Sequence, residues 1–300
     1  YHGTAHDHLG NNENVRVEVI DGITTVWVKT MHYRTNGLKR LLSEVQFGLG
    51  ATRAARDFDS SPDVVVADSV TPINGAFGVR VANARHAAFV HQIRDVWPIA
   101  LVGDKSIKKN SLVYYSFRAI EKFLYRRADW VCTSLPMVHQ HIENSGGDSR
   151  RVTYVRNGAD LDQFSGFKPY AGGGSVFKAV YVGTIAHAHD VITIVKAAAM
   201  FEKEGDRRFQ FLIYGDGVKK AECVSEASKE GLMNLTFKGM VDKKDVPEIL
   251  ADADILIASV LKSDAYEFGM NLNKLYDYFA AGRPVIFSGS APNDDVKEAN

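Results

Sequence analysis

From residue 62 to its end, the sequence alternates short apolar runs with longer segments of helical spacing. Runs such as PDVVVADS (62–69), FKAVYVG (177–183) and ILIAS (255–259) are short, nearly continuous and rich in valine and isoleucine, as buried parallel strands are. Parallel strands need a long crossover connection, and a helix is the usual one. The alternation therefore predicts an α/β protein with doubly wound parallel sheets.

The pattern is interrupted once, which indicates two domains. KPYAGGGS (168–175) is a cluster of Pro, Gly and Ser, as in linkers, and the alternation of strand and helix starts again after it. A chain of 300 residues is long enough for two cores. We expect one Rossmann-like domain over residues 1–166 and a second over residues 167–300. Within the first, residues 15–30 alternate apolar and polar residues around an Asp-Gly pair, which predicts a β-hairpin.

Charge and composition exclude several classes of function. The chain has 36 basic and 36 acidic residues, so no broad attraction to nucleic acid is expected. Two cysteines, Cys132 and Cys223, do not support a disulfide scaffold and fit a reducing compartment. No apolar run approaches the length of a membrane span and no signal peptide is recognisable, so we expect a cytoplasmic protein.

The segment EFGMNLNKLYDYFAAGRPVI (267–286) predicts a helix with a ligand at its start. One apolar face follows helical spacing and consists of Leu272, Leu275, Tyr276 and Phe279. The start of a helix has free N–H groups that suit a phosphate, and Gly269 would allow a close approach. Asp277, on the other side, could accept hydrogen bonds from ribose hydroxyls. An equally open interpretation is that Glu267 and Asp277 are solvated and that the glycine only makes a turn.

A second candidate anion loop, GTIAHAHD (183–190), follows a predicted strand. Gly183 and Thr184 would offer N–H groups and a hydroxyl there, and Asp190 could cap the next helix. Most turns of this kind in α/β proteins bind nothing, so the pattern alone is weak. In doubly wound sheets, however, ligands bind beyond the carboxyl ends of the strands, where this loop lies.

Several segments, in order and at the right spacing, resemble the family 4 glycosyltransferases, which have the GT-B fold. They are GLKRLLSEVQF, PDVVVADS, IRDVWP, FLYRRADWVCTS, VRNGADLDQF, YVGTIAHAHDVITIVKAAAMF, FLIYGDG, NLTFKGMVDKKDVPEILADADILIAS and NKLYDYFAAGRPVI. The bacterial subgroup that builds O-antigens and capsules is the most similar. The resemblance implies two Rossmann-like domains facing a cleft. It also implies transfer of a sugar from a nucleoside diphosphate sugar with retained anomeric configuration, without a metal or other cofactor.

The resemblance assigns roles to four residues near the reaction. Arg94 and Asp95 stand where many relatives have a His-Asp pair beside the reacting sugar. Lys274 matches the lysine of a Ser-Lys pair in this subgroup. Glu267 lies near the place of the first glutamate of a paired-glutamate motif, but the family's usual spacing leads to Gly269 instead. The first carboxylate is therefore displaced or absent.

The resemblance also implies a set of donor contacts. Asp277 falls at the second glutamate of the paired motif, which binds the donor ribose, and Thr184 replaces a phosphate-binding arginine of many relatives. The implied donor-binding residues are Gly183, Thr184, His189, Gly215, Gly217, Met240, Val241, Gly269, Met270, Asn271, Asn273 and Asp277. The glycines at 215 and 217, with Met240 and Val241, would frame the base.

By analogy with the subgroup, the donor is a UDP sugar and the acceptor is a glycan or lipid-linked glycan of cell-envelope polysaccharide synthesis. Two other hypotheses stay open. One is a catalytically degraded GT-B protein that holds a nucleotide sugar or a partner. The other is a GT-B nucleotide-sugar epimerase. The resemblance further places a glycine-rich loop before Tyr1 and a helix after Asn300, so we expect the first strand and the C-terminal helix of the fold to be missing.

Metal and membrane binding are weaker alternatives. The Asp-x-Asp triplets at 57–59, 160–162 and 252–254 are similar to a metal motif of other sugar transferases, but each fits a helix end, a capping loop or a turn. His2, His6 and His8 fit a polar loop better than a metal site. The predicted helix 111–127 has Arg118, Lys122 and Arg126 on one face, which could rest on anionic lipids at the inner face of the cytoplasmic membrane.

Overall fold

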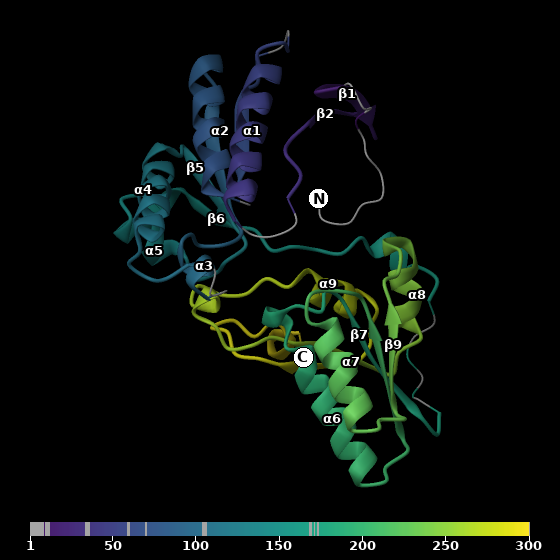
Figure 1. Ribbon diagram of the computed structural model, residues 1–300. Helices are drawn as coiled ribbons and strands as arrows, with labels where there is room; N and C mark the ends of the chain where they lie inside the picture. The colour runs from purple at the N-terminus through teal and green to yellow at the C-terminus, as the bar shows by residue number, and fades with distance from the viewer. Residues whose placement is uncertain are drawn as a thin grey trace. The chain divides into compact units, whose positions relative to one another are not determined.

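The computed structural model describes residues 9, 13–33, 37–58, 61–69, 71–103, 107–167, 170, 172 and 174–299. Its contacts divide the chain into two compact units, Tyr1–Val155 and Arg156–Asn300. Each unit contains a parallel sheet with helices packed on it (Figure 1). The predicted α/β architecture with two Rossmann-like domains is confirmed. The contacts divide the chain ahead of residue 166, and the boundary predicted there from the linker stays a prediction.

The first unit has a four-stranded parallel sheet in the order β3-β4-β5-β6. Its strands are β3 (Val64–Asp68), β4 (Ala88–Ile93), β5 (Trp130–Thr133) and β6 (Val152–Tyr154). The predicted hairpin is present as β1 (Val15–Ile20) and β2 (Ile23–Val28), which pair antiparallel. Asp21 and Gly22 join the two strands with positive φ angles of 52° and 79°, which is the geometry that makes an Asp-Gly pair a hairpin signal.

Helices α1 (Leu38–Ala54) and α2 (Pro72–Arg85) run side by side in the first unit (Figure 1). A short α3 (Ile99–Gly103) is followed by α4 (Leu112–Arg127) and α5 (His139–Asn144). The hydroxyl of Ser111 caps α4 by accepting the N–H of Tyr114 at 3.2 Å, as expected of serine before a helix. Leu124 and Tyr125 bury the inner face of α4.

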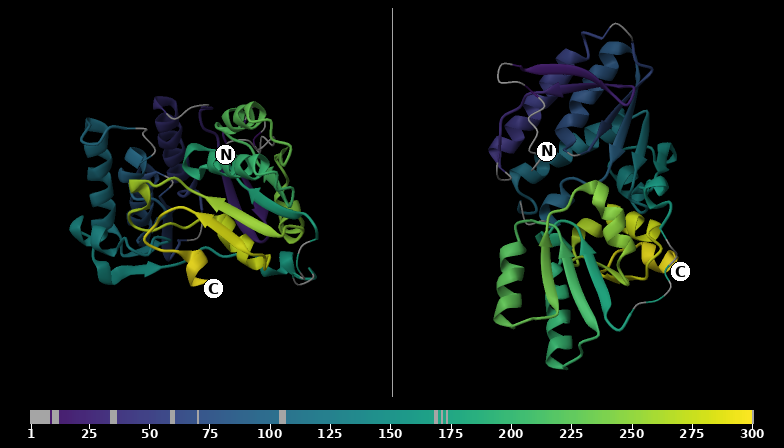
Figure 2. Two further views of the ribbon diagram at one scale, coloured as in Figure 1. Left: turned by 90° about the horizontal axis from the view of Figure 1, so that it is seen from below. Right: turned by 90° about the vertical axis from the view of Figure 1, so that its right-hand side faces the viewer.

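The second unit has a five-stranded sheet in the order β11-β10-β7-β8-β9. The strands are β7 (Phe177–Val182), β8 (Phe209–Tyr214), β9 (Leu235–Gly239), β10 (Ile255–Ser259) and β11 (Val285–Ser288). Strands β7, β8 and β9 lie side by side (Figure 2, right). After β9 the chain crosses to the other side of β7 and forms β10. The strand order therefore reverses between β7 and β10, which is the topological switch point of a doubly wound sheet.

Alternate residues of β7 separate two cores. Ala179 and Tyr181 pack with α6 (Val191–Lys203) and α7 (Lys220–Lys229), whereas Val180 packs with α8 (Val246–Ala251) and α9 (Asn273–Ala280). Side chains of a strand alternate between the two faces of the sheet, so helices cover both faces of this one. A short α10 (Asp295–Glu298) follows β11.

Candidate functional site

Strands β7 and β10 separate at the switch point, and a tyrosine stands between them. The two strands pair only at Ile255–Ala179 and Leu256–Val180. Beyond these pairs, the hydroxyl of Tyr278 accepts the N–H of Val182 at 3.0 Å and lies 3.3 Å from the carbonyl oxygens of Val182 and Ile257, to which its proton can be donated. The backbone is thus satisfied although the strands diverge. We call the place where their carboxyl ends diverge the β7–β10 crevice, and doubly wound sheets bind ligands at such a place.

The buried face of α9 differs from the predicted one. Leu275 and Tyr278 are each 1% exposed, whereas Leu272, Tyr276 and Phe279 are only half-buried. The predicted face omitted Tyr278, whose hydroxyl here replaces strand hydrogen bonds. Helix α9 is thus rotated about its axis relative to the predicted orientation, and Lys274 lies toward β7.

Lys274, in the first turn of α9, places a cation at the crevice. Its Nζ lies 2.9 Å from the hydroxyl of Tyr181 and 4.0 Å from the centroid of that ring. A Cβ atom on Gly183 would fall 2.7 Å from this Nζ, so the glycine leaves the room that the ammonium occupies. Burial lowers the pKa of Lys274 to about 7. A cation held out of water in this way is a candidate partner for an anion.

The loops after β7 and β8 are joined by backbone hydrogen bonds. The N–H of Gly183 donates to a β8 carbonyl at 3.0 Å. The sequence had suggested that this N–H is free to bind a phosphate, and it is not. Gly183 contributes space instead. Side chains at Gly215 and Gly217 would collide with the carbonyl oxygens of Gly183 and Ile185, and both glycines have positive φ. Thr184, by contrast, is exposed at the tip of its loop.

His189 ends the same loop, in the 3₁₀ turn η3 (His187–His189). Its carbonyl oxygen accepts the hydroxyl of Ser259 at 2.7 Å, which ties the loop to the end of β10. Burial and the charge of Lys274 lower the pKa of His189 to about 4, so the imidazole is neutral at pH 7. Asp190 occupies the N-cap of α6, but its carboxylate accepts the hydroxyl of Thr193 at 2.8 Å instead of a backbone N–H as predicted.

The loop before α9 is held by a residue that the sequence did not reveal. The side-chain oxygen of Asn293 accepts the N–H of Met270 at 2.7 Å, and its amide nitrogen donates to the carbonyl of Met270 at 2.8 Å. Gly269 precedes this clamp with a φ of 108°. In the described part of the chain, neither polar atom of the buried Asn271 amide has a hydrogen-bond partner. An unsatisfied buried amide at such a place points to a group that binds there.

Asn273 and Asp277 differ in their exposure to solvent, since Asn273 is exposed and Asp277 is half-buried. The side chain of Asn273 accepts a hydrogen bond from Asn157, which brings the VRNG segment to the start of α9. Asp277 is half-buried, and desolvation raises its pKa while Lys243 opposes the rise. Among the described residues, nothing donates a hydrogen bond to its carboxylate. Glu267 is exposed at the end of the 3₁₀ turn η5 (Asp264–Tyr266).

The predicted base-framing residues follow β9. Met240 is 71% exposed and Val241 is half-buried. The structure thus brings Gly183, Thr184, His189 and Lys274 together at the crevice, with Gly215 and Gly217 in the adjoining loop. The ligand contacts of the whole set stay predictions.

In the first unit, Arg94 and Asp95 follow β4. The Nε of Arg94 lies 3.1 Å from a carboxylate oxygen of Asp68, and its backbone N–H donates to the hydroxyl of Ser69 at 3.0 Å. Desolvation and then the charge of Asp68 raise the pKa of Asp95. The indole of Trp97 donates to the carbonyl of Ser69 at 3.2 Å. Ser69 therefore holds this turn through both its hydroxyl and its carbonyl.

A cavity of about 260 Å³ adjoins this turn at the carboxyl end of the first sheet. Its lining is mainly apolar and includes Leu41, Thr71, Trp97, Leu101, Val113 and Phe117. The rings of Trp97 and Phe117 pack at a tilt of 43° with centroids 5.2 Å apart. The hydroxyl of Thr71 is buried and has no hydrogen-bond partner in the described residues. The cavity can hold an apolar group that carries one polar end.

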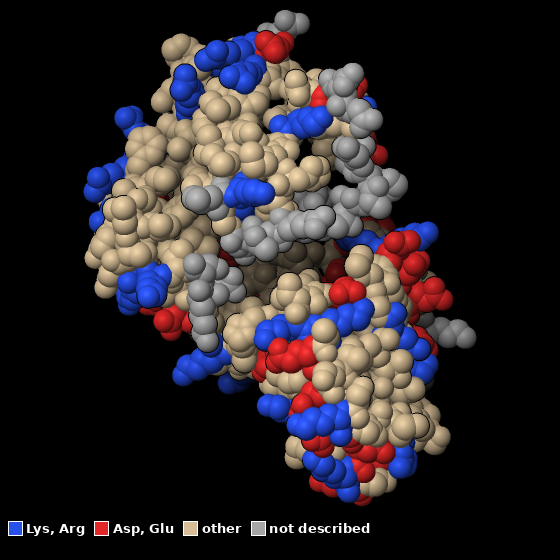
Figure 3. Space-filling view, viewed as in Figure 1, with Lys and Arg blue, Asp and Glu red and all other residues tan. Residues whose placement is uncertain are grey.

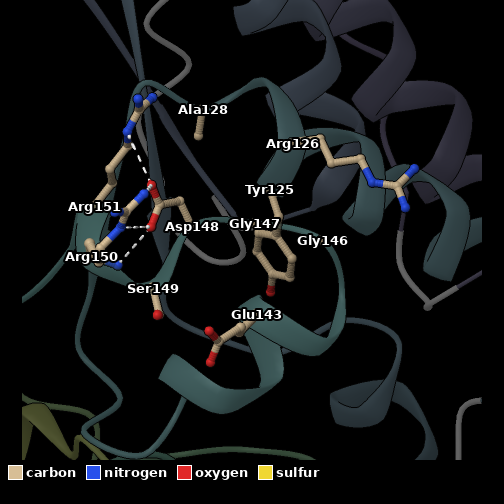
Figure 4. A pocket seen from close by; sticks show the side chains of 10 residues that line it. All are labelled: Tyr125, Arg126, Ala128, Glu143, Gly146, Gly147, Asp148, Ser149, Arg150 and Arg151. Carbon is tan, nitrogen blue, oxygen red and sulfur yellow. Dashed lines mark hydrogen bonds and ion pairs between the residues drawn. The ribbon is translucent and has the colours of Figure 1, made fainter.

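A larger hollow of about 540 Å³ lies at the amino ends of β5 and β6 (Figure 4). Arg150 and Arg151 point at Asp148, and Arg126 points away from it (Figure 4). Hydrogen bonds from Arg150 hold the pKa of Asp148 at about 2. Asp148 is therefore already paired with both of these arginines. The hollow also lies at the edge of the sheet opposite the strand ends that bind ligands.

No group of three or more potential metal ligands occurs in the parts of the chain that the structure describes. His2, His6, His8 and Asp59 lie outside those parts. Asp252 pairs with the side chain of Lys178 at 2.7 Å, and Asp254 accepts the backbone N–H of Lys178, also at 2.7 Å. The triplet at 252–254 is thus used for structure.

The predicted lipid-facing side of α4 is only partly available. Arg118 turns inward and donates to the buried Glu121 at 2.7 Å, so it does not belong to an outward face. Lys122 and Arg126 line a surface hollow instead. On the face seen in Figure 3, basic and acidic side chains alternate over the second unit. Within the described ranges, no helix is both long and apolar enough to span a bilayer.

Comparisons with known proteins place the chain in a family. The profile of the Glycosyl transferase 4-like domain matches residues 4–158, and that of the Glycosyl transferases group 1 matches residues 177–299. A search of curated proteins found no match.

Solved structures share the fold at low identity. Sucrose-phosphate synthase from Thermosynechococcus elongatus has a TM-score of 0.66 at 16% identity, over 97% of this chain and 75% of that one. Anabaena HepE in complex with UDP has a TM-score of 0.60 at 12% identity, over 88% and 72%. The lipopolysaccharide outer core galactosyltransferase WaaB has a TM-score of 0.54 at 15% identity, over 86% and 65%. The two matching profiles, together with the two Rossmann-like units, show that the chain belongs to the GT-B glycosyltransferases.

Proposed function

We propose that the chain is a retaining, metal-independent glycosyltransferase with a UDP sugar as donor. Its acceptor is a glycan or lipid-linked glycan of cell-envelope polysaccharide synthesis, and it works in the cytoplasm, in peripheral contact with the membrane. The observation that carries the proposal is the ammonium of Lys274 at the β7–β10 crevice, 2.9 Å from Tyr181 and without a carboxylate partner in the described residues. A donor diphosphate supplies the missing countercharge.

The relatives support the finer points of the proposal. HepE was crystallised with UDP and with UDP-glucose, which favours a UDP sugar here. WaaB acts on the lipopolysaccharide outer core, which favours an envelope role. The apolar cavity beside Arg94 and Asp95 fits an acceptor with an apolar part.

The chemistry follows from where negative charge develops. When the sugar leaves, the diphosphate gains charge, and fixed cations and N–H groups lower the barrier. Lys274 and N–H groups in the first turn of α9 would supply this stabilisation. Asp277, whose carboxylate accepts no hydrogen bond in the described residues, would bind the ribose hydroxyls. By the resemblance, Arg94 and Asp95 would act on the reacting sugar.

Donor turnover tests the proposal. The protein is incubated with UDP-glucose, UDP-galactose and UDP-N-acetylglucosamine in EDTA, and the release of UDP and the configuration of the freed sugar are followed by NMR. We expect slow hydrolysis of one donor with retained configuration, reduced about 100-fold by Lys274→Met and unchanged by Lys229→Met on the exposed end of α7. Release of a 2-epimeric sugar would replace the proposal with an epimerase. Nucleotide binding without turnover of any donor would replace it with a binding protein.

A further inference from the structure

Tyr181, in β7, lies directly beneath Lys274 and has a defined hydroxyl orientation. Its hydroxyl donates to the carbonyl of Thr184 at 2.7 Å. A phenol has one proton, so a lone pair is left for the ammonium of Lys274 at 2.9 Å. One side chain thus links the cation to the turn that follows β7.

The ring and the hydroxyl of Tyr181 have separate tasks. The ring is fully buried and packs in the core with Ile194 and Ile213. The same ring faces the ammonium at 4.0 Å, a favourable cation–π distance. Among the described residues, the hydroxyl makes no polar contact besides the two given above. Replacing Tyr181 by Phe therefore removes the polar link and keeps the packing.

The surroundings of Lys274 leave its charge without compensation. The titratable groups that face it are Tyr181 from β7 and His189 from η3, and the imidazole is neutral. Asp277 is on the same helix but interacts with Lys243. Within the described residues, no carboxylate lies at ion-pair distance from Lys274.

We infer that Tyr181 is the positioning residue of the donor site: its hydroxyl holds the Lys274 ammonium against the Gly183–Thr184 turn, where the diphosphate binds. This inference rests on the donor site proposed above. It adds that the affinity for the nucleotide is coupled to the uptake of a proton by Lys274.

The sign of this coupling follows from the charge of the ligand. With its pKa near 7, Lys274 is mostly neutral at pH 8 in the free protein. A bound diphosphate favours the ammonium, so binding takes up a proton and weakens as the pH rises above 7. The Tyr181 hydroxyl favours the ammonium too. Without it, the loss of affinity begins at a lower pH.

The experiment is calorimetric titration with UDP from pH 6 to pH 8.5. At pH 8, Tyr181→Phe is expected to bind UDP about tenfold more weakly than the wild type. At pH 6 the two should agree within about twofold, since Lys274 is then charged in both. Lys274→Met should bind weakly without the extra pH dependence. Tyr214→Phe, on the neighbouring strand, is the control and should follow the wild type.

The outcomes separate this inference from the proposed function. An equal loss of affinity at all pH values in Tyr181→Phe would overturn the coupling to proton uptake by Lys274, and no loss at any pH would overturn the positioning role; the donor site stands in both cases. Absence of UDP binding by the wild type at every pH would overturn both. If Tyr181→Phe does not fold, proton uptake by the wild type at pH 8, measured in two buffers of different ionisation enthalpy, decides: no uptake overturns the inference.

Discussion

The backbone of Gly215 lies so close to that of Gly183 that a side chain at 215 would overlap the carbonyl oxygen of Gly183. The φ of Gly215 is also positive, at 134°. The two loops after β7 and β8 can therefore approach each other only because residue 215 has no Cβ atom.

Gly215→Ala is expected to lower the free energy of unfolding by about 3 kcal/mol, because a backbone atom has to move. The matched control is Gly231→Ala, which also has a positive φ but open space around it, and which should cost only about 1 kcal/mol. Urea unfolding measures both. Equal losses would mean that the loops are not in contact.

Asn293→Ala is expected to destabilise the protein by about 1–3 kcal/mol and to weaken UDP binding, because both hydrogen bonds to the backbone of Met270 are lost. Asn144→Ala, at an exposed position of α5, should change neither property. A destabilised Asn293 variant with unchanged UDP affinity would show that the loop before α9 does not contact the nucleotide.

Asp277→Asn should stabilise the fold while weakening UDP binding. Desolvation raises the pKa of Asp277, so its charged form costs stability above the ordinary aspartate pKa of about 4. The variant should therefore have a higher Tm than the wild type at pH 7 and the same Tm at pH 3. A lower Tm at pH 7 would show that the carboxylate is a structural partner and not a ligand site.

Glu121→Ala is expected to cost about 3–5 kcal/mol without affecting the nucleotide site. This buried carboxylate accepts hydrogen bonds from Arg118 at 2.7 Å and Tyr125 at 3.0 Å and lies 2.8 Å from His141. Its removal takes the carboxylate partner from the half-buried guanidinium of Arg118 and from the buried hydroxyl of Tyr125. Glu143→Ala, at an exposed position, is the control, and a similar small effect in both variants would contradict the buried network.

The order of strands and helices could be predicted from the sequence because it depends on local signals. The Asp-Gly hairpin, Ser111 as a cap and Gly282 after α9 each act within a few residues. Short valine-rich runs also predict the strands, because such runs are typical of parallel strands buried on both faces. These signals need no knowledge of neighbours in space.

The details of the site depend on neighbours far away in the chain. Pairing of β7 with β8 consumes the Gly183 amide, and nothing near Gly183 in the sequence reveals this. Tyr278 replaces hydrogen bonds between strands that separate only in the folded sheet. Helix α9 and strand β11 both lie between Asn293 and the loop that it holds. A position for Lys274 over Tyr181 follows from the rotation of α9, which the buried Tyr278 sets.

Thermal unfolding in the presence of UDP, GDP and dTDP tests the central claim most directly. A ligand that binds only the folded state raises the Tm by mass action. UDP is expected to raise the Tm of the wild type and of Lys229→Met, and to lose this effect in Lys274→Met and Asp277→Ala. If no nucleotide stabilises the wild type, or if both site variants respond like the wild type, the β7–β10 crevice is not the donor site.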